Sequence, residues 1–464
     1  MVTYVGSTIR VVEPSEQLVQ WCKEHLTLPN PDYYKKERMG LWTGKTPETI
    51  SLWRMGSTTP SHLPMLEMPF GVFREVQHLL DNVQVLFRYH DHVGYGKQIP
   101  LYDYQQDAVD AIYNKRYGIL QSQCGSGKTQ CMLALIQRYG IKALWLTHTA
   151  DLLRQSKERA ERYMDSSLMG TITEGKVNIG SGITFATVQT MNKMDLRPYR
   201  DEWGVIVCDE CHRVVGSTNG LAMFEKVLNN LSCGHKYGCS GSVHRADGLI
   251  RATFSLIGRV IYTVPDEAVK ALVEPVSVET VQTDAVMPEE AVKDDGSIVW
   301  AKLINGLCVD EGRNRLIADK IIENRDHSCL ILSDRLSHLE TLMGMLPDDM
   351  RADAVMISGK MTSKKGKAER EAAIEQMRTG EKKYLFATYT LAKEGLDVPR
   401  LERLFMTTPQ KDEAVIIQSL GRIARKFEGK AKPVCIDFVD GKIGIMVGMW
   451  KKRIRIYRQK GMEM

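Results

Sequence analysis

Between residues 101 and 265, short apolar runs alternate with longer amphipathic stretches. The runs Ile141–Leu146, Gly182–Ala186 and Trp203–Cys208 are predicted strands. Trp203–Cys208 is almost continuously apolar, as in a strand that is buried on both faces. Leu101–Ile112 and Asp151–Tyr163 are predicted helices, the first with the 3.6-residue period of an amphipathic helix and an exposed glutamine near its start. Strands that alternate with helices predict a parallel sheet, with ligands at the carboxyl ends of the strands.

A second alternating series begins near residue 328. Its predicted strands are Ser328–Ser333, Ala354–Ile357, Lys383–Ala387, Leu401–Met406 and Pro433–Phe438. Lys364–Arg378 and Trp450–Arg458 are predicted basic helices. Between the two series, residues 265–312 contain three prolines and acidic clusters such as Glu289–Glu290 and Asp294–Asp295, and they lack a clear period, so we predict a joint between lobes there.

Residues 1–98 have a different pattern. Short apolar alternation, as at Val83–Phe87, predicts a small α+β module. Basic and aromatic residues interleave at Tyr33–Arg38 and Phe87–His90, which favours either a nucleic-acid contact or a solvated face over a packed core. The predicted organisation is therefore an accessory domain at 1–98, an α/β lobe at 99–268 and a second α/β lobe with a basic terminal helix at 269–464.

Composition narrows the class of protein. No run of about 18 apolar residues occurs and the N-terminus lacks a signal pattern, so we expect a soluble, cytoplasmic protein. A net charge of +5 permits a nucleic-acid groove without requiring one. The ten cysteines lie mostly in apolar runs, as expected of reduced thiols. Cys208 and Cys211 have CxxC spacing, and Cys233, His235 and Cys239 follow, so a zinc site is a minor alternative.

The stretch Gln121–Thr129, with the sequence QSQCGSGKT, lies between a predicted strand and a predicted helix. A glycine-rich turn at a helix N-terminus directs backbone N–H groups at a phosphate. Lys128 would then reach the β- and γ-phosphates, and the Thr129 hydroxyl would hold Mg²⁺. Ser122 replaces the glycine of the strict P-loop pattern, so an ordinary turn with a solvated lysine is the alternative.

An acidic pair ends the apolar run Trp203–Cys208. Beside a phosphate-binding loop, Asp209 would hold the Mg²⁺ ion and Glu210 would polarise the attacking water. The alternative is a solvated strand end.

Gln418, Arg422 and Arg425 are spaced by four and three residues, which would place them on one face of a helix. Arginine supplies a rigid, positively charged fork where the γ-phosphate transition state forms. We therefore predict that ATP hydrolysis uses arginines of the second lobe; a basic surface helix is the alternative.

Asp209–His212 has the sequence DECH, a variant of the DEAH box. Together with the glycine-rich loop and the arginine motif, it makes residues 100–440 or so resemble a superfamily 2 helicase. Four further segments resemble motifs of that family: Thr147–Gln155, Thr187–Thr190, Gly238–Arg245 and Thr388–Pro399. The resemblance implies two RecA-like parallel-sheet lobes in tandem, with ATP and Mg²⁺ as cofactors. It is greatest for the XPB, UvsW and RadD-like group, and the small N-terminal module favours phage enzymes that remodel branched DNA.

The resemblance also assigns roles to individual residues. It implies that Gln105 contacts the adenine and that two residues lie near the ribose, Gly395 and Asp397. The implied contacts of the loop are Cys124, Gly125, Ser126 and Gly127. DNA contacts fall to Thr149, Arg154, Thr187, Gln189, Thr190 and Thr388. Coupling between hydrolysis and movement falls to His212, Ser240 and Ser242, although a structural histidine is an alternative for His212. Ser240 and His148 depart from the usual family residues at their positions.

The sequence thus predicts a DNA-dependent ATPase that unwinds or branch-migrates forked or junction DNA. An RNA helicase and an ATP-gated annealing clamp are the alternatives. The expected partners are branched or forked DNA and replication or recombination proteins. We expect a monomer in the cytoplasm, that of the host cell if the protein is phage-encoded.

Overall fold

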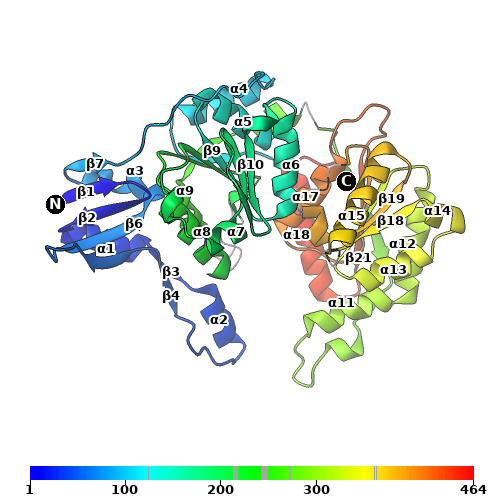
Figure 1. The fold of residues 1–464 in the computed structure, drawn as a ribbon. Coiled ribbons are helices and arrows are strands. Elements are labelled where there is room, and N and C mark those ends of the chain that lie inside the picture. Colours follow the sequence, from blue (N-terminus) through cyan, green and yellow to red (C-terminus); the bar gives the residue numbers. More distant parts are fainter. Residues whose placement is uncertain are drawn as a thin grey trace. The chain divides into compact units, whose positions relative to one another are not determined.

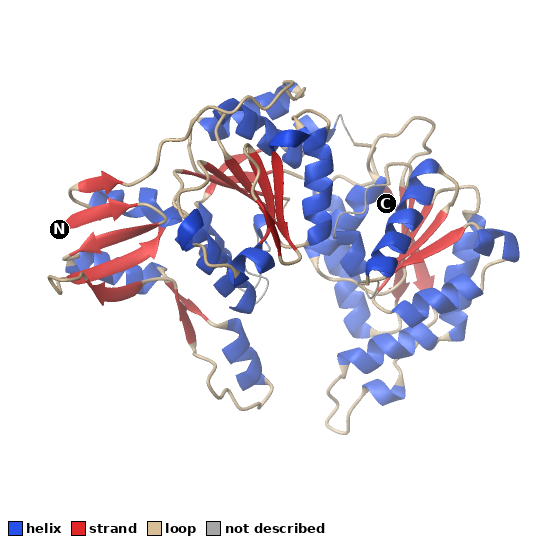
Figure 2. Ribbon diagram, in the orientation of Figure 1, coloured by secondary structure: helices blue, strands red, loops and turns tan. Residues whose placement is uncertain are grey.

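The computed structural model describes residues 1–123, 125–212, 218–241, 249–270, 273–359, 361, 363–393, 396 and 398–464 (Figure 1). These residues form two compact units, Met1–Asp266 and Glu267–Met464. Within each unit the strands of the large sheet lie between helices (Figure 2). In the described part of the chain, no helix is both long and apolar enough to cross a membrane.

The N-terminal part of the first unit forms a five-stranded sheet. Its strands, in spatial order, are β5 (Arg54–Ser57), β6 (Pro64–Pro69), β2 (Thr8–Val12), β1 (Val2–Val5) and β7 (Val83–Val85). The helix α1 (Glu16–His25) buries Leu18 and Cys22. A two-stranded ribbon of β3 (Thr27–Pro29) and β4 (Thr49–Ser51) leads away from this sheet to α2 (Pro31–Arg38), which buries none of its residues (Figure 1). We call residues 27–51 the arm.

The rest of the first unit is built on an eight-stranded sheet. Its strands, in spatial order, are β11 (Lys176–Asn178), β10 (Met169–Thr173), β12 (Ile183–Thr187), β9 (Ala143–Thr147), β13 (Val205–Asp209), β14 (His235–Ser240), β8 (Gly118–Gln121) and β15 (Val260–Thr263). Neighbouring strands are parallel except for the β10–β11 hairpin. The helices are α4 (Asp103–Tyr113), α5 (Lys128–Tyr139), α6 (Ala150–Glu161), α7 (Val188–Lys193), α8 (Thr218–Asn230) and α9 (Ile250–Ile257). All five residues of β9, β12 and β13 are buried, as the apolar run at 203–208 predicts.

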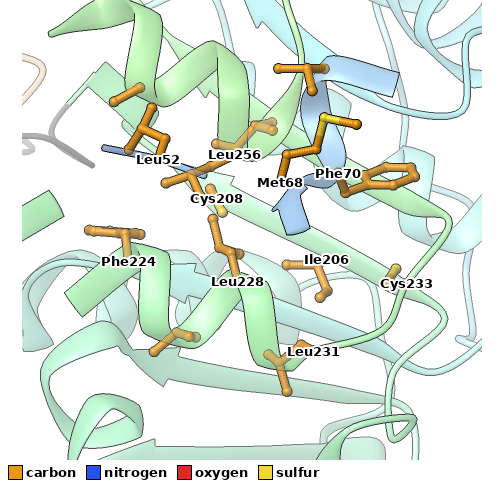
Figure 3. Close-up of a cluster of buried hydrophobic side chains, with 14 of the residues drawn as sticks. Leu52, Met68, Phe70, Ile206, Cys208, Phe224, Leu228, Leu231, Cys233 and Leu256 are labelled. Atoms are coloured by element: carbon orange, nitrogen blue, oxygen red, sulfur yellow. The ribbon is translucent and has the colours of Figure 1, made fainter. Parts of the chain in front are cut away.

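The N-terminal sheet and the eight-stranded sheet share one hydrophobic core (Figure 3). Met68 and Phe70 meet Leu256 of α9 and Cys208 of β13 in this core. A Cβ atom on Gly71 would lie 2.5 Å from the Phe254 carbonyl oxygen, so only glycine permits this approach. The separate accessory domain at residues 1–98 remains a prediction, because the contacts of the chain place it with the first lobe in one unit.

The second unit contains a six-stranded, wholly parallel sheet. Its strands, in spatial order, are β16 (Ser277–Thr283), β21 (Val434–Asp440), β20 (Arg403–Met406), β17 (Cys329–Ser333), β19 (Tyr384–Thr388) and β18 (Ala354–Ile357). Its helices are α11 (Trp300–Val309), α12 (Glu311–Glu323), α13 (Leu336–Gly344), α14 (Asp348–Ala352), α15 (Lys364–Thr379), α16 (Tyr389–Lys393), α17 (Glu413–Ile423) and α18 (Gly444–Gln459). Leu330 and Leu332 enter one core cluster while Cys329 and Ile331 enter another, so the sheet is buried on both faces. The predicted fold class, two RecA-like lobes with a small N-terminal α+β part, is confirmed.

The joint predicted at residues 265–312 is partly wrong. Ser277–Thr283 is the edge strand β16, which pairs with β21 over seven residues, and Trp300–Val309 is a helix. Glu279, Thr280 and Gln282 of this edge strand are accessible, so it lacks the continuous apolar pattern of the central strands.

Candidate functional site

The loop between β8 and α5 has the backbone geometry of a phosphate cradle. Gly125 and Gly127 have φ angles of +86° and +79°, which L side chains rarely adopt. A Cβ atom on Gly125 would meet nothing within 4 Å among the described residues. Lys128 begins α5, and no side-chain hydrogen bond caps that helix at its N-cap, Gly127. A helix N-terminus of this kind favours an anion.

Gln105 supports this loop from α4. Its Nε2 donates to the Ser126 carbonyl oxygen at 2.9 Å, and its Oε1 accepts from the Tyr102 N–H at 3.0 Å. The Tyr104 hydroxyl donates to the same Ser126 carbonyl at 2.7 Å. The Gln105 side chain is buried, unlike the exposed glutamine expected near the helix start, because both ends of its amide are engaged by backbone groups. Its predicted contact with adenine stays a prediction.

Ser122, which departs from the strict P-loop pattern, fastens the loop. The buried Ser122 hydroxyl donates to the Ser126 hydroxyl at 2.6 Å, which in turn donates to the Gln123 carbonyl at 2.7 Å. The Ser122 N–H donates to the Ser240 carbonyl at 3.0 Å, which joins the loop to the end of β14. A glycine at 122 would lack the first of these bonds.

Replacing Ser122 with alanine should raise the KM for ATP about five-fold, because a net hydrogen bond of about 1 kcal/mol that orders the loop is lost. The measurement is steady-state ATPase against ATP concentration. Ser167→Ala, at an exposed serine outside the loop, is the matched control and should leave KM unchanged. An unchanged KM in Ser122→Ala would show that the loop is ordered without this hydroxyl.

The predicted catalytic residues of the first unit lie together at the carboxyl ends of β13 and β8. Lys128 Nζ lies 3.8 Å from Glu210 Oε1 and donates to the Gln123 carbonyl at 3.3 Å. Asp209 ends β13, and its carboxylate accepts from the Glu210 N–H at 2.9 Å and from the Ser156 hydroxyl at 3.3 Å. Glu210 has a φ of +48°, a conformation that is uncommon for residues with a side chain and is concentrated at functional sites.

The electrostatics suit a divalent cation. Burial, and next the neighbouring Glu210 carboxylate, raise the pKa of Asp209. The acidic pair is therefore unfavourable without a positive charge close to it, which Lys128 supplies in part. Thr129, on the first turn of α5, and Asp209 are residues whose oxygens could hold Mg²⁺ beside phosphates on the α5 N-terminus. The residues present thus fit both ATP and Mg²⁺.

His212 connects the acidic pair to β14. Its Nδ1 lies 3.2 Å from Glu210 Oε2 and 2.8 Å from the Ser240 hydroxyl. Lys128, Glu210, His212 and Ser240 therefore form a continuous chain of polar contacts from the phosphate loop to the predicted coupling motif. Glu210 and Ser240 thus both lie beside the same ring atom, His212 Nδ1.

A recess of about 520 Å³ lies beside the carboxyl ends of β9, β10 and β12. Four of the predicted DNA-contacting residues line it: Thr149, Thr187, Gln189 and Thr190. The Gln189 amide donates to the His148 carbonyl at 2.6 Å, and the Thr187 hydroxyl donates to that of Thr190 at 3.0 Å. Arg154 does not line the recess; it pairs with Glu158 along the exposed face of α6 at 2.9 Å.

In the second unit, the predicted face of Gln418, Arg422 and Arg425 is partly wrong. Gln418 and Arg422 lie on α17, but that helix ends at Ile423 and Arg425 follows it in an isolated antiparallel bridge with Val273. The helix ends because the backbone beyond it pairs with another segment of the chain. Arg422 Nη1 donates to the Leu396 carbonyl at 3.0 Å, and the buried Gln418 Oε1 has no hydrogen-bond partner among the described residues. Thr388 is half-buried at the end of β19.

Four predicted site residues lie outside the described residues: Cys124, Ser242, Gly395 and Asp397. The roles of all site residues remain predictions. Sequence analysis missed Ser122, Tyr104 and Ser156 as supporting residues, because no pattern of spacing marks a hydroxyl whose hydrogen-bond partner is set by the fold.

Nine cysteines are described, and all are free and buried. Cys208 and Cys211 lie in the core shared with the N-terminal sheet. Among the residues with described positions, no group of three or more histidine, cysteine or acidic side chains is arranged to hold a metal ion. The CxxC spacing is thus accounted for by packing.

Comparisons with known proteins agree with this geometry. The family model described as type III restriction enzyme, res subunit, matches residues 98–241, and the model of the helicase conserved C-terminal domain matches residues 313–427. A putative ATP-dependent RNA helicase, L396, of Acanthamoeba polyphaga mimivirus is 26% identical over 332 residues, which cover 70% of this chain and 60% of that protein. The ATP-dependent DNA helicase uvsW of Enterobacteria phage T4 is 23% identical over 368 residues, which cover 74% of this chain and 69% of that protein.

Among solved structures, S. cerevisiae Dbp5 bound to RNA and ADP BeF3 is similar in fold. Its TM-score is 0.53 at 16% identity, and the match covers 78% of this chain and 92% of that chain. At this identity the similarity shows the fold alone and nothing of the substrate.

Proposed function

Because the chain belongs to the superfamily 2 helicases, we propose that it is an ATP-dependent DNA helicase or translocase that unwinds or branch-migrates forked or junction DNA. The observation that carries the proposal is the contact chain from Lys128 through Glu210 and His212 to Ser240. It links a phosphate-binding loop to the segment that resembles the coupling motif. An ATPase that only binds nucleic acid would not need such a link.

In the proposed hydrolysis, the loop and the α5 N-terminus bind the phosphates. Lys128 would neutralise charge on the phosphate oxygens, and Thr129 and Asp209 would hold a Mg²⁺ ion that supplies further positive charge there. Glu210 accepts a hydrogen bond from the attacking water and orients it. Gln418, Arg422 and Arg425 stabilise the negative charge on the phosphoryl group that is transferred.

The recess lined by Thr149, Thr187, Gln189 and Thr190 is the proposed contact to one nucleic-acid strand in the first unit. Hydroxyl and amide groups bind phosphate and sugar oxygens without reading the bases. We therefore expect little sequence preference. Lys193, which also lines the recess, adds a cation, so the affinity should decrease as salt increases.

An RNA helicase is the second candidate, favoured by the name of the mimivirus relative. The test is the stimulation of ATPase activity by a panel of single strands, duplexes, forks and four-way junctions, each as DNA and as RNA. We expect forked and four-way DNA to stimulate most, with Lys128→Ala inactive throughout. Stronger stimulation by RNA would favour the second candidate, and wild-type turnover in Lys128→Ala would contradict the assigned ATPase site.

The arm is the proposed recognition element for branched DNA. Trp42, in the segment between α2 and β4, is 87% exposed, and α2 carries Lys35, Lys36 and Arg38. An exposed indole between basic residues can stack on an unpaired base while the charges bind phosphates. Trp42→Ala should weaken binding to forks about ten-fold, because one stacked base contributes about 1–3 kcal/mol.

Fork and single-strand affinities, measured by fluorescence anisotropy, test this prediction. The single-strand-stimulated kcat of Trp42→Ala should equal that of the wild type. Val85→Ala, at an exposed apolar residue on β7, is the control. Equal fork affinity in Trp42→Ala and the wild type would show that Trp42 of the arm does not contribute to the recognition of branched DNA.

A further inference from the structure

One lysine side chain holds the backbone that follows α17. Lys430 Nζ donates to the carbonyl oxygens of Ile423 at 2.6 Å and Arg425 at 2.7 Å. It also donates to the carbonyl oxygen of Pro399 at 3.3 Å. An ammonium group has three N–H donors and no acceptor, so these three bonds use its whole hydrogen-bonding capacity.

The three carbonyls belong to two segments with predicted roles. Ile423 is the last residue of α17, and its carbonyl is one of the four that a helix leaves without an intrahelical partner. The negative end of the helix dipole also favours a cation there. Pro399 closes the segment Thr388–Pro399, which resembles the motif that contacts nucleic acid and ribose. Lys430 thus ties the end of that segment to the end of the arginine-bearing helix.

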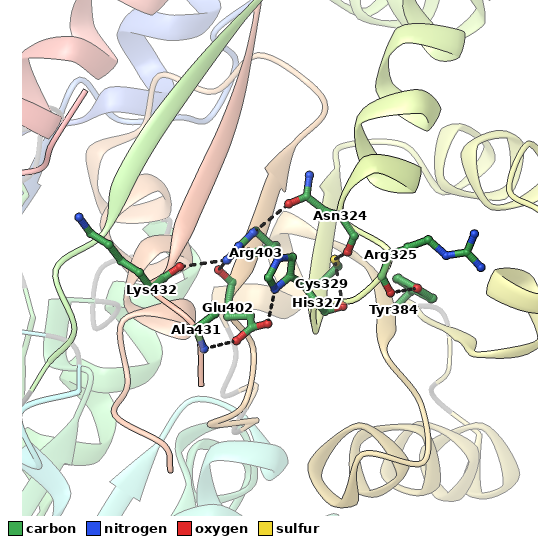
Figure 4. A network of polar contacts seen from close by, with 9 residues as sticks. All are labelled: Asn324, Arg325, His327, Cys329, Tyr384, Glu402, Arg403, Ala431 and Lys432. Atoms are coloured by element: carbon green, nitrogen blue, oxygen red, sulfur yellow. Dashed lines mark hydrogen bonds and ion pairs between the residues drawn. The ribbon is translucent and has the colours of Figure 1, made fainter. Parts of the chain in front are cut away.

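The turn that carries Lys430 is itself anchored. Gly429 has a φ of +75°, and the Lys430 N–H donates to the Phe427 carbonyl at 3.2 Å. The next residue, Ala431, donates its N–H to Glu402 Oε2 at 2.7 Å (Figure 4). Glu402 Oε1 is in turn 2.6 Å from His327 Nδ1 (Figure 4). The ammonium is therefore presented from a fixed position.

A second contact holds the same backbone from the other side. The Glu274 N–H donates to the Ala424 carbonyl at 2.7 Å, and Val273 forms the antiparallel bridge with Arg425. Both residues lie near the start of the second unit, which begins at Glu267. The main chain of Arg425 is thus fixed on one side by Lys430 and on the other by the segment at 273–274.

The charge of Lys430 is sensitive to pH. Burial lowers the pKa of the Lys430 ammonium to about 8, although the Glu402 and Glu274 carboxylates oppose this and Arg425 adds to it. Carboxylates and guanidinium groups ordinarily titrate far from pH 8, so among the groups that face it Lys430 is the one that changes charge there.

We propose that Lys430 is a positioning residue for ATP hydrolysis, which fixes the backbone from which the Arg425 guanidinium extends. The inference rests on the proposed role of Arg425 at the transferred phosphoryl group. A shift of about 1 Å in a group that acts on the transition state can cost about 100-fold in rate. Lys430 would act on kcat without touching ATP or nucleic acid.

The test is the nucleic-acid-stimulated ATPase of Lys430→Met, which keeps the length of the side chain and removes its charge and donors. We expect kcat to decrease about 10- to 100-fold with the KM for ATP within about two-fold of wild type. Lys430→Arg, which retains charge and donors, should recover most of the lost kcat. Lys432→Met is the matched control, since that lysine is exposed and pairs only with Glu463 in the described structure, and it should behave as wild type.

Two further readouts separate positioning from a general loss of structure. In the double variant Lys430→Met with Arg425→Ala, kcat should equal that of Arg425→Ala alone, because a residue that acts through Arg425 has no effect once Arg425 is absent. The wild-type kcat should decrease as pH rises through about 8, as the ammonium loses its proton. In Lys430→Arg that decrease should disappear.

Different outcomes overturn different claims. If Arg425→Ala is impaired but Lys430→Met keeps full kcat, the inference on Lys430 is wrong and the proposed function stands. If the two single losses multiply in the double variant, Lys430 does not act through Arg425 and the inference is also wrong. If Arg425→Ala itself has wild-type turnover, the assigned ATPase site is wrong. Thermal unfolding of each variant, expected near that of wild type, checks that the second unit is folded.

Discussion

Arg425→Ala should hydrolyse ATP about 1,000-fold more slowly than the wild type at saturating nucleic acid. An arginine that neutralises charge on the transferred phosphoryl group contributes about 10³–10⁵ to kcat, and alanine removes both its charge and its planar fork. The affinity for ATP should change little, because the phosphate loop, Lys128 and α5 belong to the other unit and remain intact. Single-turnover hydrolysis and equilibrium binding of a fluorescent ATP analogue measure the two quantities separately.

Two further variants calibrate this result. Arg425→Lys retains the charge but loses the fork, so its kcat should lie between those of Arg425→Ala and the wild type. Lys426→Ala removes the neighbouring exposed cation and should have no effect on hydrolysis. A kcat of Arg425→Ala within about three-fold of wild type would exclude Arg425 from the transition state.

The fold was largely predictable because buried parallel strands have a local signature. Val205–Asp209 and Cys329–Ser333 are short apolar runs, and the sheets place them at central positions where both faces are covered. The strand β16 was missed because it is an edge strand with accessible polar residues. Its place in the sheet depends on pairing with Val434–Asp440, more than 150 residues along the chain, and no local pattern reports such a partner.

The candidate site divides in the same way. Lys128 and Asp209–Glu210 could be predicted because phosphate and Mg²⁺ chemistry demands these residue types at the carboxyl ends of parallel strands in one sheet. The hydrogen bonds that hold the surrounding backbone could not be predicted from the sequence. Ser122 fastens the loop through a hydroxyl four residues away, and Lys430 binds carbonyls at positions that meet only in the folded chain. Arg425 fell outside its predicted helix because backbone pairing with Val273 ends α17 earlier than side-chain spacing suggests.

Glu210→Gln should reduce kcat about 10²- to 10⁴-fold, the usual contribution of a positioned general base. The amide keeps the shape of the carboxylate, so Lys128 and His212 retain a neighbour of the same size at 3.8 Å and 3.2 Å. A neutral amide cannot accept the proton of the attacking water. Removal of a negative charge next to the phosphate loop should leave ATP binding unchanged or tighter, since Glu210 contributes to the charge that raises the pKa of Asp209.

This combination of slow hydrolysis and intact ATP binding distinguishes Glu210 from Lys128. Lys128→Ala should lose ATP affinity as well as turnover, because the ammonium contacts the phosphates in the ground state. Glu210→Gln should instead remain ATP-bound and hold nucleic acid without releasing it, which a slowed dissociation of labelled DNA in the presence of ATP and Mg²⁺ would detect. Glu202→Gln, at a glutamate paired with Lys142 away from the loop, is the control. If Glu210→Gln and Lys128→Ala lose ATP affinity equally, Glu210 serves to shape the loop and another group must orient the attacking water.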